Sequence, residues 1–209
     1  MTLRPGTGCG RIATGLTQLL DQNSDYIGVD ILPGLVDFGR KFITPRYPRF
    51  KFLLLDEGNF TYDTLRPKGS AVDIAKLWQA APTGSVDLAI SISLFTHLDF
   101  AAAVDVLKNI SRLLATDGQA FITIFVVDSE ARRNIESGVT GFRFAHRTPS
   151  GELSAEKLDD PTFAVGYEVE KMDELVDKVG LQRERWIRGY WSQGNDGETF
   201  QDALVLRKR

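Results

Sequence analysis

Three glycines stand at alternating positions near the start of the chain, where the sequence reads LRPGTGCGRIATGL. They are Gly6, Gly8 and Gly10, and apolar residues with helical spacing follow them at once. A glycine loop that opens a helix suits an anionic or nucleotide-like ligand, because backbone N–H groups and the helix dipole point at the ligand and no Cβ blocks its approach. The segment therefore predicts a binding loop for such a ligand.

A carboxylate follows the loop at a distance that suits a nucleoside. Asp30 ends the short apolar segment YIGVD, about as far beyond the glycines as the acidic residue that binds ribose hydroxyls in nucleotide-binding sites. The stretch GCGRIA also satisfies the pattern G-x-G-x-x-A, so the loop fits a nicotinamide cofactor as well as S-adenosylmethionine. The alternative is that Asp30 only caps the turn after its segment.

The composition fits one globular domain that does not bind nucleic acid or membranes. The chain has 209 residues, 43% of them apolar and 25% charged, and its formal net charge is −3. This charge gives no general attraction to nucleic acid or anionic membranes, and no apolar run approaches the roughly 18 residues that span a bilayer. One cysteine and two histidines allow no internal disulfide and are too few for a typical zinc site. We expect a single cytoplasmic, soluble domain over residues 1–209, with no metal.

Helices and strands are predicted to alternate along the chain. Apolar residues at helical spacing predict helices at 11–20, 35–43, 71–79, 100–114 and 172–179. Short apolar segments predict strands at 26–30, 49–56, 85–95, 119–127, 181–191 and 200–209. This alternation indicates a parallel sheet with right-handed crossovers, and hence an α/β fold.

Two of these helices carry clear apolar stripes. The longer one follows Asp99, a predicted N-cap, and Gly118 suits the turn after its last residue. The stripe of the earlier helix consists of Leu35, Phe38, Phe42 and Ile43. We expect both stripes to face the core.

Residues 128–166 interrupt the alternation with a mixed segment that is too long for an ordinary connection. We interpret it as a lid or substrate loop. Together with Tyr190 and Trp191 it concentrates aromatic residues that suit an organic substrate, although the same residues could be the core of a long loop. Arg143, Arg147 and Arg188 could meet an acidic substrate or form a solvated face.

Five segments together resemble a class I S-adenosylmethionine-dependent methyltransferase. The domain they resemble is of methyltransferase type 11, 12 or 25. They are residues 6–16, 26–42, 85–98, 106–126 and 200–208. The most specific run is SISLFTHL, followed by a helix that ends in LLATDG, where family members commonly have LLKPGG. The resemblance implies a Rossmann-like, doubly wound sheet of seven strands, mostly parallel with an antiparallel last strand, and S-adenosyl-L-methionine as cofactor.

By this resemblance the cofactor would be held by the glycine loop and by the ends of three strands. The residues implied are Gly6, Gly8, Gly10, Asp30, Ile31, Asp56, Ser91 and Ser93. The glycines and the two serines would pass the methionine part, Asp30 would accept the ribose hydroxyls, and Ile31 and Asp56 would contact adenine. Asp56 could equally be a solvated turn residue.

Arg4 departs from the family pattern. Family members have an acidic residue two places before the first glycine, where it helps to hold the cofactor's ammonium group, and this chain has Arg4 there. Because two positive groups repel, we expect Arg4 to turn outward or to contact the methionine carboxylate. The first strand is also reduced to MTLR, which as a stub would leave neighbouring backbone groups unpaired. We interpret both features as a late start or an altered N-terminus.

Two histidines are candidate general bases for methyl transfer. The reaction is an in-line displacement in which the protein mainly aligns the nucleophile, and an imidazole with a pKa of about 6.5 suits deprotonation of a hydroxyl acceptor. His97 follows the strand at the cofactor edge, and His146 lies in the long segment. Each could instead be a capping, packing or surface residue.

The function that these residues favour is O-methylation of a small organic molecule. The chain has no Asn/Asp-Pro-Pro-Tyr segment, which weighs against methylation of a base or an amide nitrogen, and no acidic cluster for Mg²⁺ follows SIS. Two alternatives stay open: a nicotinamide-dependent oxidoreductase, and a methyltransferase-like interaction domain whose cofactor site is impaired by Arg4. The oligomeric state is not predicted.

Overall fold

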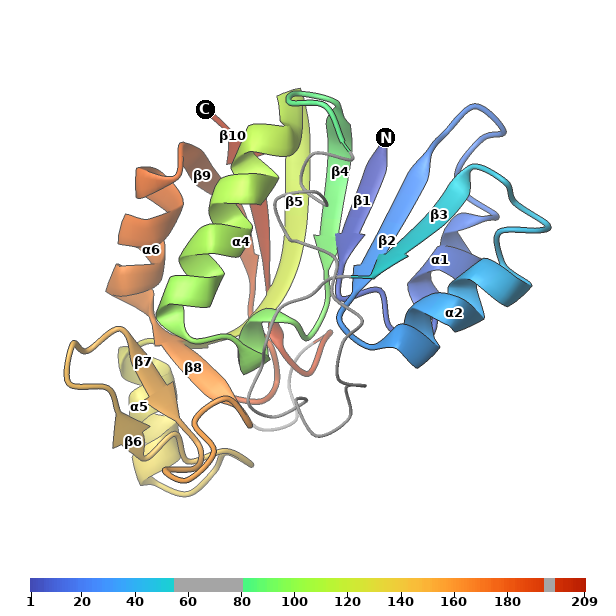
Figure 1. The fold of residues 1–209 in the computed structure, drawn as a ribbon. Coiled ribbons are helices and arrows are strands. Elements are labelled where there is room, and N and C mark those ends of the chain that lie inside the picture. The colour runs from blue at the N-terminus through green and yellow to red at the C-terminus, as the bar shows by residue number, and fades with distance from the viewer. Residues whose placement is uncertain (55–80, 194–197) are drawn as a thin grey trace.

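A mostly parallel sheet carries helices on both of its faces (Figure 1). The computed structural model describes residues 1–54, 81–193 and 198–209. One face is covered by α1 (Arg11–Leu16) and α2 (Pro33–Phe42), and the other by α4 (Phe100–Leu113) and α6 (Val169–Lys178). Neighbouring strand residues enter different cores, Tyr26 under α1 and α2 and Ile27 under α4 and α6, as the pleat requires. The predicted α/β, doubly wound architecture is confirmed.

Seven strands form the sheet in the order β3-β2-β1-β4-β5-β10-β9. Their bounds are β1 Thr2–Pro5, β2 Tyr26–Asp30, β3 Phe50–Leu54, β4 Val86–Ser91, β5 Leu114–Val127, β9 Leu181–Ile187 and β10 Asp202–Lys208. The first five are parallel, and β10 lies antiparallel between β5 and β9. This is the seven-stranded arrangement that the resemblance implied.

The first strand is short but paired on both sides. β1 pairs with β2 along its whole length, from Thr2 opposite Tyr26 to Pro5 opposite Val29. On the other side Thr2 and Leu3 pair with β4, and the Met1 carbonyl accepts from the Asp87 N–H at 2.9 Å. The expectation that this strand leaves its neighbours unpaired is therefore wrong.

The segment predicted as a lid or substrate loop contains regular structure of its own. It forms α5 (Ser129–Glu136), β6 (His146–Arg147), β7 (Leu153–Ala155) and the first half of β8 (Val165–Glu168). β8 runs parallel to the last three residues of β5, and β7 and β6 follow it in antiparallel order. With these three strands the sheet has ten strands in the described part of the chain. The three strands lie beside the lower end of β5 in Figure 1.

Of the two residues predicted at the ends of α4, the structure confirms Asp99 and contradicts Gly118. Asp99 caps α4 as predicted, since its Oδ1 accepts from the Ala102 N–H at 2.8 Å. Gly118, predicted in the turn after this helix, lies inside β5. A Cβ there would come within 2.6 Å of the Val86 carbonyl oxygen, so glycine is needed where β4 and β5 approach and their register shifts.

The buried face of α2 differs from the predicted stripe. Phe38 and Phe42 are 43% and 50% exposed and pack on each other, whereas Val36 and Gly39 face the sheet. The cause is close packing, because a Cβ on Gly39 would lie 2.4 Å from the Phe52 ring. With glycine at the contact the helix rests on that ring, which turns the two phenylalanines toward solvent.

Two further predictions fall short of the structure or outside it. The first helix ends at Leu16, and Leu19, which was predicted on its apolar stripe, is 80% exposed. The helix predicted at residues 71–79 lies outside the described residues. Within the described ranges, no helix combines the length and apolarity needed to cross a membrane.

A buried carboxylate joins the last strands of the sheet. Asp202, at the start of β10, accepts four hydrogen bonds. Its Oδ2 takes the N–H groups of Val126 and the Trp191 indole, and its Oδ1 takes those of Gly189 and the Trp186 indole, at 2.6–3.2 Å. Burial raises the pKa of Asp202, and the four donors oppose that rise. The side chain therefore couples β5, β9 and the connection between β9 and β10.

We expect Asp202→Asn to destabilise the protein by about 2–4 kcal/mol. An amide has one oxygen in place of two, so two of the four donors would face an NH₂ group. Urea unfolding would measure the change, with Asp105→Asn on the exposed face of α4 as the control. Equal stability of the two variants would show that the four hydrogen bonds contribute little.

Candidate functional site

The glycine loop joins β1 to α1 at the carboxyl end of the sheet. Gly6, Gly8 and Gly10 all have positive φ, at 69°, 56° and 77°, a conformation that L side chains rarely adopt. A Cβ on Gly10 would also come 2.5 Å from Ile43, whereas no atom of the described residues lies within 4 Å of a Cβ on Gly8. The loop is thus packed against α2 at its end and open at its middle.

Asp30 meets this loop directly. Its Oδ2 accepts from the Gly8 N–H at 2.7 Å, and its Oδ1 accepts from the Leu32 N–H at 3.1 Å. The second bond is the turn-capping contact that was the alternative interpretation of Asp30, so the carboxylate both caps its turn and contacts the loop. Each oxygen has a further lone pair, and Asp30 can accept two more donors.

The loop after β4 lies next to the glycine loop. A Cβ on Gly6 would contact the Leu94 side chain at 3.5 Å. Beside Leu94, Ser93 has a positive φ of 56°, which is strained for a residue with a side chain. Its N–H donates to Thr123 Oγ1 at 2.8 Å, and its hydroxyl donates to Gln201 Oε1 at 3.1 Å. Thr123 on β5 and Gln201, the residue before β10, thus hold the strained residue.

The remaining residues implied for the cofactor are placed as follows. Ser91 ends β4, and its buried hydroxyl has no hydrogen-bond partner among the described residues. Ile31 is half-buried and packs against the core under α4. Asp56 lies outside the described residues. The structure therefore brings the three glycines, Asp30, Ser91 and Ser93 to one edge of the sheet.

His97 is positioned by the long segment that follows β5. It ends the short 3₁₀ helix η2 (Phe95–His97), and its Nδ1 lies 3.1 Å from the Thr162 carbonyl oxygen. The hydroxyl of Tyr167 is directed at the carbonyl oxygens of Phe95 and Leu98, at 3.0 and 2.9 Å. Burial raises the pKa of Tyr167, so its hydroxyl stays protonated and can donate. Both contacts fix the turn that carries His97.

His146 is placed elsewhere. It is exposed on β6, which is separated from β1 by β4, β5, β8 and β7 in the sheet order. Two of the arginines considered for an acidic substrate pair within the protein: Arg147 lies 3.8 Å from Glu168, and Arg188 pairs with Asp128 and Glu130. The structure does not bring His146 to the edge that carries the glycine loop.

Arg4 points into the protein. It is 6% exposed, so the expectation of an outward side chain is wrong. Within the part of the chain that the structure describes, its Nε and Nη1 have no hydrogen-bond partner. Burial lowers the pKa of Arg4. Beside it, the Tyr26 hydroxyl bonds Thr7 Oγ1 at 2.8 Å, and burial raises the pKa of Tyr26 to about 12. A cation is therefore buried next to the glycine loop without a full set of acceptors.

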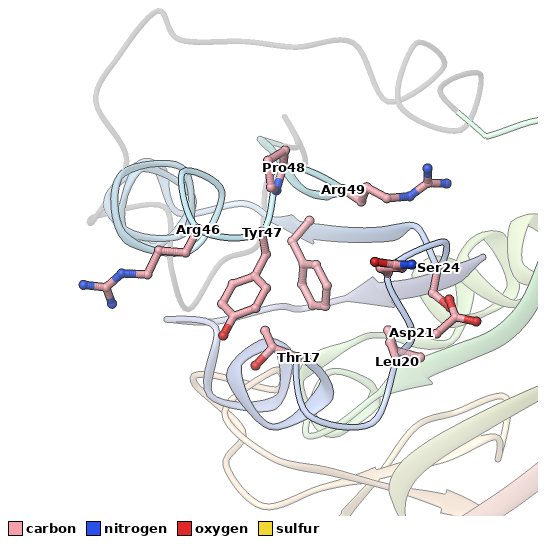
Figure 2. A pocket seen from close by; sticks show the side chains of 10 residues that line it. Thr17, Leu20, Asp21, Ser24, Arg46, Tyr47, Pro48 and Arg49 are labelled. Carbon is pink, nitrogen blue, oxygen red and sulfur yellow. The ribbon is translucent and has the colours of Figure 1, made fainter.

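An open cavity of about 290 Å³ lies at the opposite end of β2 and β3 (Figure 2). Its walls come from the segments that precede these two strands, including Tyr47, which is labelled in Figure 2. Phe50, the first residue of β3, also lines it. Among the residues that the structure describes, none of those implied for the cofactor lines it. The cavity is therefore separate from the candidate site.

Sequence reasoning missed the residues that hold the site together. Thr123 was inside a segment predicted as a plain buried strand, although a hydroxyl in that apolar run was a usable signal. Gln201 and Tyr167 gave no local signal, since their side-chain partners are 69 or more residues away in the chain. Such contacts depend on the sheet order.

A comparison with protein-family models matches residues 3–122 to a methyltransferase domain. The match covers more than half of the chain and includes the glycine loop, Asp30 and the loop after β4. The chain belongs to this methyltransferase family. The nicotinamide-dependent alternative has no such support.

Solved structures of methyltransferases share the fold. A TehB-like SAM-dependent methyltransferase from Corynebacterium glutamicum is 20% identical, matches 100% of this chain and 79% of its own, and has a TM-score of 0.55. 1,6-Didemethyltoxoflavin-N1-methyltransferase from Burkholderia thailandensis is 16% identical, matches 99% of this chain and 70% of its own, and has a TM-score of 0.56. Mitomycin 7-O-methyltransferase is 14% identical and has a TM-score of 0.60. The match covers 100% of this chain and 48% of that protein, so this chain spans about half of its length.

We expect Arg4→Met to stabilise the protein by about 1–3 kcal/mol. Methionine keeps much of the aliphatic stem and removes a buried charge whose donors lack acceptors. Urea unfolding would measure the gain, with Arg49→Met, in an exposed pair with Asp25, as the control. A less stable Arg4→Met variant would mean that the guanidinium makes a net favourable interaction in the folded protein.

Proposed function

We propose that the protein is an S-adenosylmethionine-dependent methyltransferase that methylates a hydroxyl group of a small organic molecule. The observation that carries the proposal is the hydrogen bond between Asp30 and the Gly8 N–H in a chain of the methyltransferase family. It joins the predicted ribose-binding carboxylate to the predicted binding loop at the carboxyl edge of the sheet, where ligands of open α/β sheets bind.

The residues present fit a nucleoside at this edge. Among the described residues, none approaches a Cβ on Gly8 within 4 Å and none bonds the buried Ser91 hydroxyl. Asp30 has lone pairs left for two hydroxyls. In the proposal Gly6, Gly8 and Gly10 pass the ribose and methionine parts, Asp30 binds ribose, and Ser91 and Ser93 line the methionine side. Ile31 and Asp56 remain the residues proposed for adenine.

In the proposed reaction the protein aligns the acceptor and removes its proton. S-adenosylmethionine, when bound, supplies a methyl group on a sulfonium. His97 is the proposed base: its Nδ1 must carry a proton to donate to the Thr162 carbonyl, which leaves the basic lone pair of the neutral ring on Nε2. His146 remains a weaker candidate for this role because it lies on the far strand β6.

Arg4 supports a second candidate function. A buried cation beside the glycine loop repels an ammonium group, and it cannot replace the acidic residue that the family has at this position. The second candidate is therefore a methyltransferase-family domain with weakened cofactor binding that serves as an interaction domain.

Titration with S-adenosylhomocysteine tests the proposal, and we expect Asp30→Asn to weaken binding about 10- to 100-fold. The amide has one acceptor oxygen where the carboxylate has two, and it loses the charge that strengthens the ribose bonds. Asp25→Asn is a matched control, since Asp25 lies just before the other end of β2 and pairs with Arg49. Binding of NAD without S-adenosylhomocysteine would favour the oxidoreductase, and binding of neither would favour the interaction domain.

We expect His97→Gln to lower turnover of a hydroxyl acceptor about 10²- to 10⁴-fold without changing the affinity for S-adenosylhomocysteine. Glutamine keeps the polarity of the side chain but cannot act as a base near neutral pH. The measurement is the rate of S-adenosylhomocysteine formation with an accepted substrate. His146→Gln is the paired variant, and a larger loss in it than in His97→Gln would assign the base to His146.

A further inference from the structure

A cluster of aromatic rings lies at the carboxyl end of β5. We define the aromatic cluster as Phe125, Phe142, Phe144, Tyr190, Trp191 and Phe200. Phe125 is at its centre, with ring centroids of four neighbours at 5.0–5.8 Å, and most of these contacts are tilted or edge-on. These are the distances and angles of favourable aromatic packing.

The aromatic cluster adjoins the candidate site along one face of β5. Alternate residues of a strand share a face, so Thr123 and Phe125 point the same way and lie about 7 Å apart along the strand. Thr123 bonds Ser93 and Gln201, and Phe200 is the residue before Gln201. From the glycine loop, the contacts run through Leu94, Ser93 and Thr123 to these rings.

The aromatic cluster has a buried base and an exposed rim. Phe125, Phe144 and Trp191 are at most 2% exposed, whereas Tyr190 and Phe200 are 38% and 42% exposed, with ring centroids 5.3 Å apart. The rim is held firmly: the Tyr190 N–H donates to the Thr199 carbonyl, the Trp191 N–H donates to the Phe200 carbonyl, and Asp202 anchors the Trp191 indole. Two half-exposed rings are thus fixed in position beside the site.

We propose that the rings of Tyr190 and Phe200 form a platform for an aromatic ring of the methyl acceptor. This inference rests on the proposed function and gives its substrate class: a planar, hydroxylated aromatic molecule. A flat ring can stack on or meet such a platform edge-on at 4.5–7 Å, with a gain beyond simple apolar burial that a saturated ring does not have. The Ser93 and Gln201 side chains at its border bind the polar edge of the acceptor.

The size of the rim favours a small molecule over a protein partner. A stable protein interface buries about 800 Å² on each side, whereas one whole aromatic side chain offers at most about 250 Å². Two half-exposed rings supply only part of that interface, but they match one fused aromatic ring system. The rim therefore suits a ligand of a few rings.

The experiment compares 2-naphthol with its saturated counterpart decahydro-2-naphthol, titrated into the full chain by calorimetry with and without S-adenosylhomocysteine. We expect 2-naphthol to bind more tightly, and both Phe200→Leu and Tyr190→Leu to weaken its binding about three- to tenfold. Phe38→Leu is the matched control, because Phe38 on α2 is 43% exposed and lies outside the aromatic cluster. Its binding of 2-naphthol should equal that of the wild type.

The results separate the platform from the proposed function. Binding of S-adenosylhomocysteine together with naphthol binding that depends on Phe200 and Tyr190 supports both. If S-adenosylhomocysteine binds but naphthol does not, or if the saturated compound binds equally well, the platform is overturned and the methyltransferase stands. If naphthol binding depends on the two rings but S-adenosylhomocysteine does not bind, the aromatic site stands and its role in methyl transfer falls. An equal loss in Phe38→Leu would mean non-specific adsorption and would overturn the platform.

Discussion

The carboxylate of Asp202 fixes the region where the last strands meet the middle of the sheet. Two main-chain N–H groups and two indole N–H groups converge on it, so every acceptor direction of a buried charge is used. A buried carboxylate is costly unless it is paired in this way, and the pairing in turn fixes its donors. Through Trp191 it orders the aromatic cluster, and through Val126 it fixes the end of β5 that pairs with β8.

The parallel strands explain why loops far apart in the sequence share one edge. Strands β1, β2, β4 and β5 all end at the same side, so the glycine loop, Asp30 and Ser93 come together without any local signal that joins them. The strained backbone of Ser93 persists because two side chains hydrogen-bond to this residue. They are Thr123 on β5 and Gln201, the residue before β10. Strain of this kind is found where the surrounding structure determines the position of a functional loop.

Features that depend on short stretches of sequence were predictable, and features that depend on close approach were not. The Asp99 cap follows from a local pattern, and the seven-stranded, mostly parallel sheet with its antiparallel last strand follows from the resemblance. The face of α2 depends on Gly39 resting on the Phe52 ring, which an apolar stripe does not encode. In the same way the glycines and Asp30 could be proposed from spacing, whereas the role of Tyr167 needs β8 to lie beside β5.

In the proposed binding mode, Arg4 and Asp30 would act on opposite ends of the cofactor. Asp30 addresses neutral ribose hydroxyls, so its contribution does not depend on the charge of the amino-acid part. Arg4 is buried in a region of low dielectric, where its field is screened less than at the surface and disfavours an ammonium group nearby. A ligand bound by this chain is therefore expected to gain most of its affinity from the nucleoside, with the amino-acid part contributing through its carboxylate. This balance follows from the residues themselves, because one charge faces the loop as an acceptor and the other lies beneath it as a cation whose donors lack acceptors.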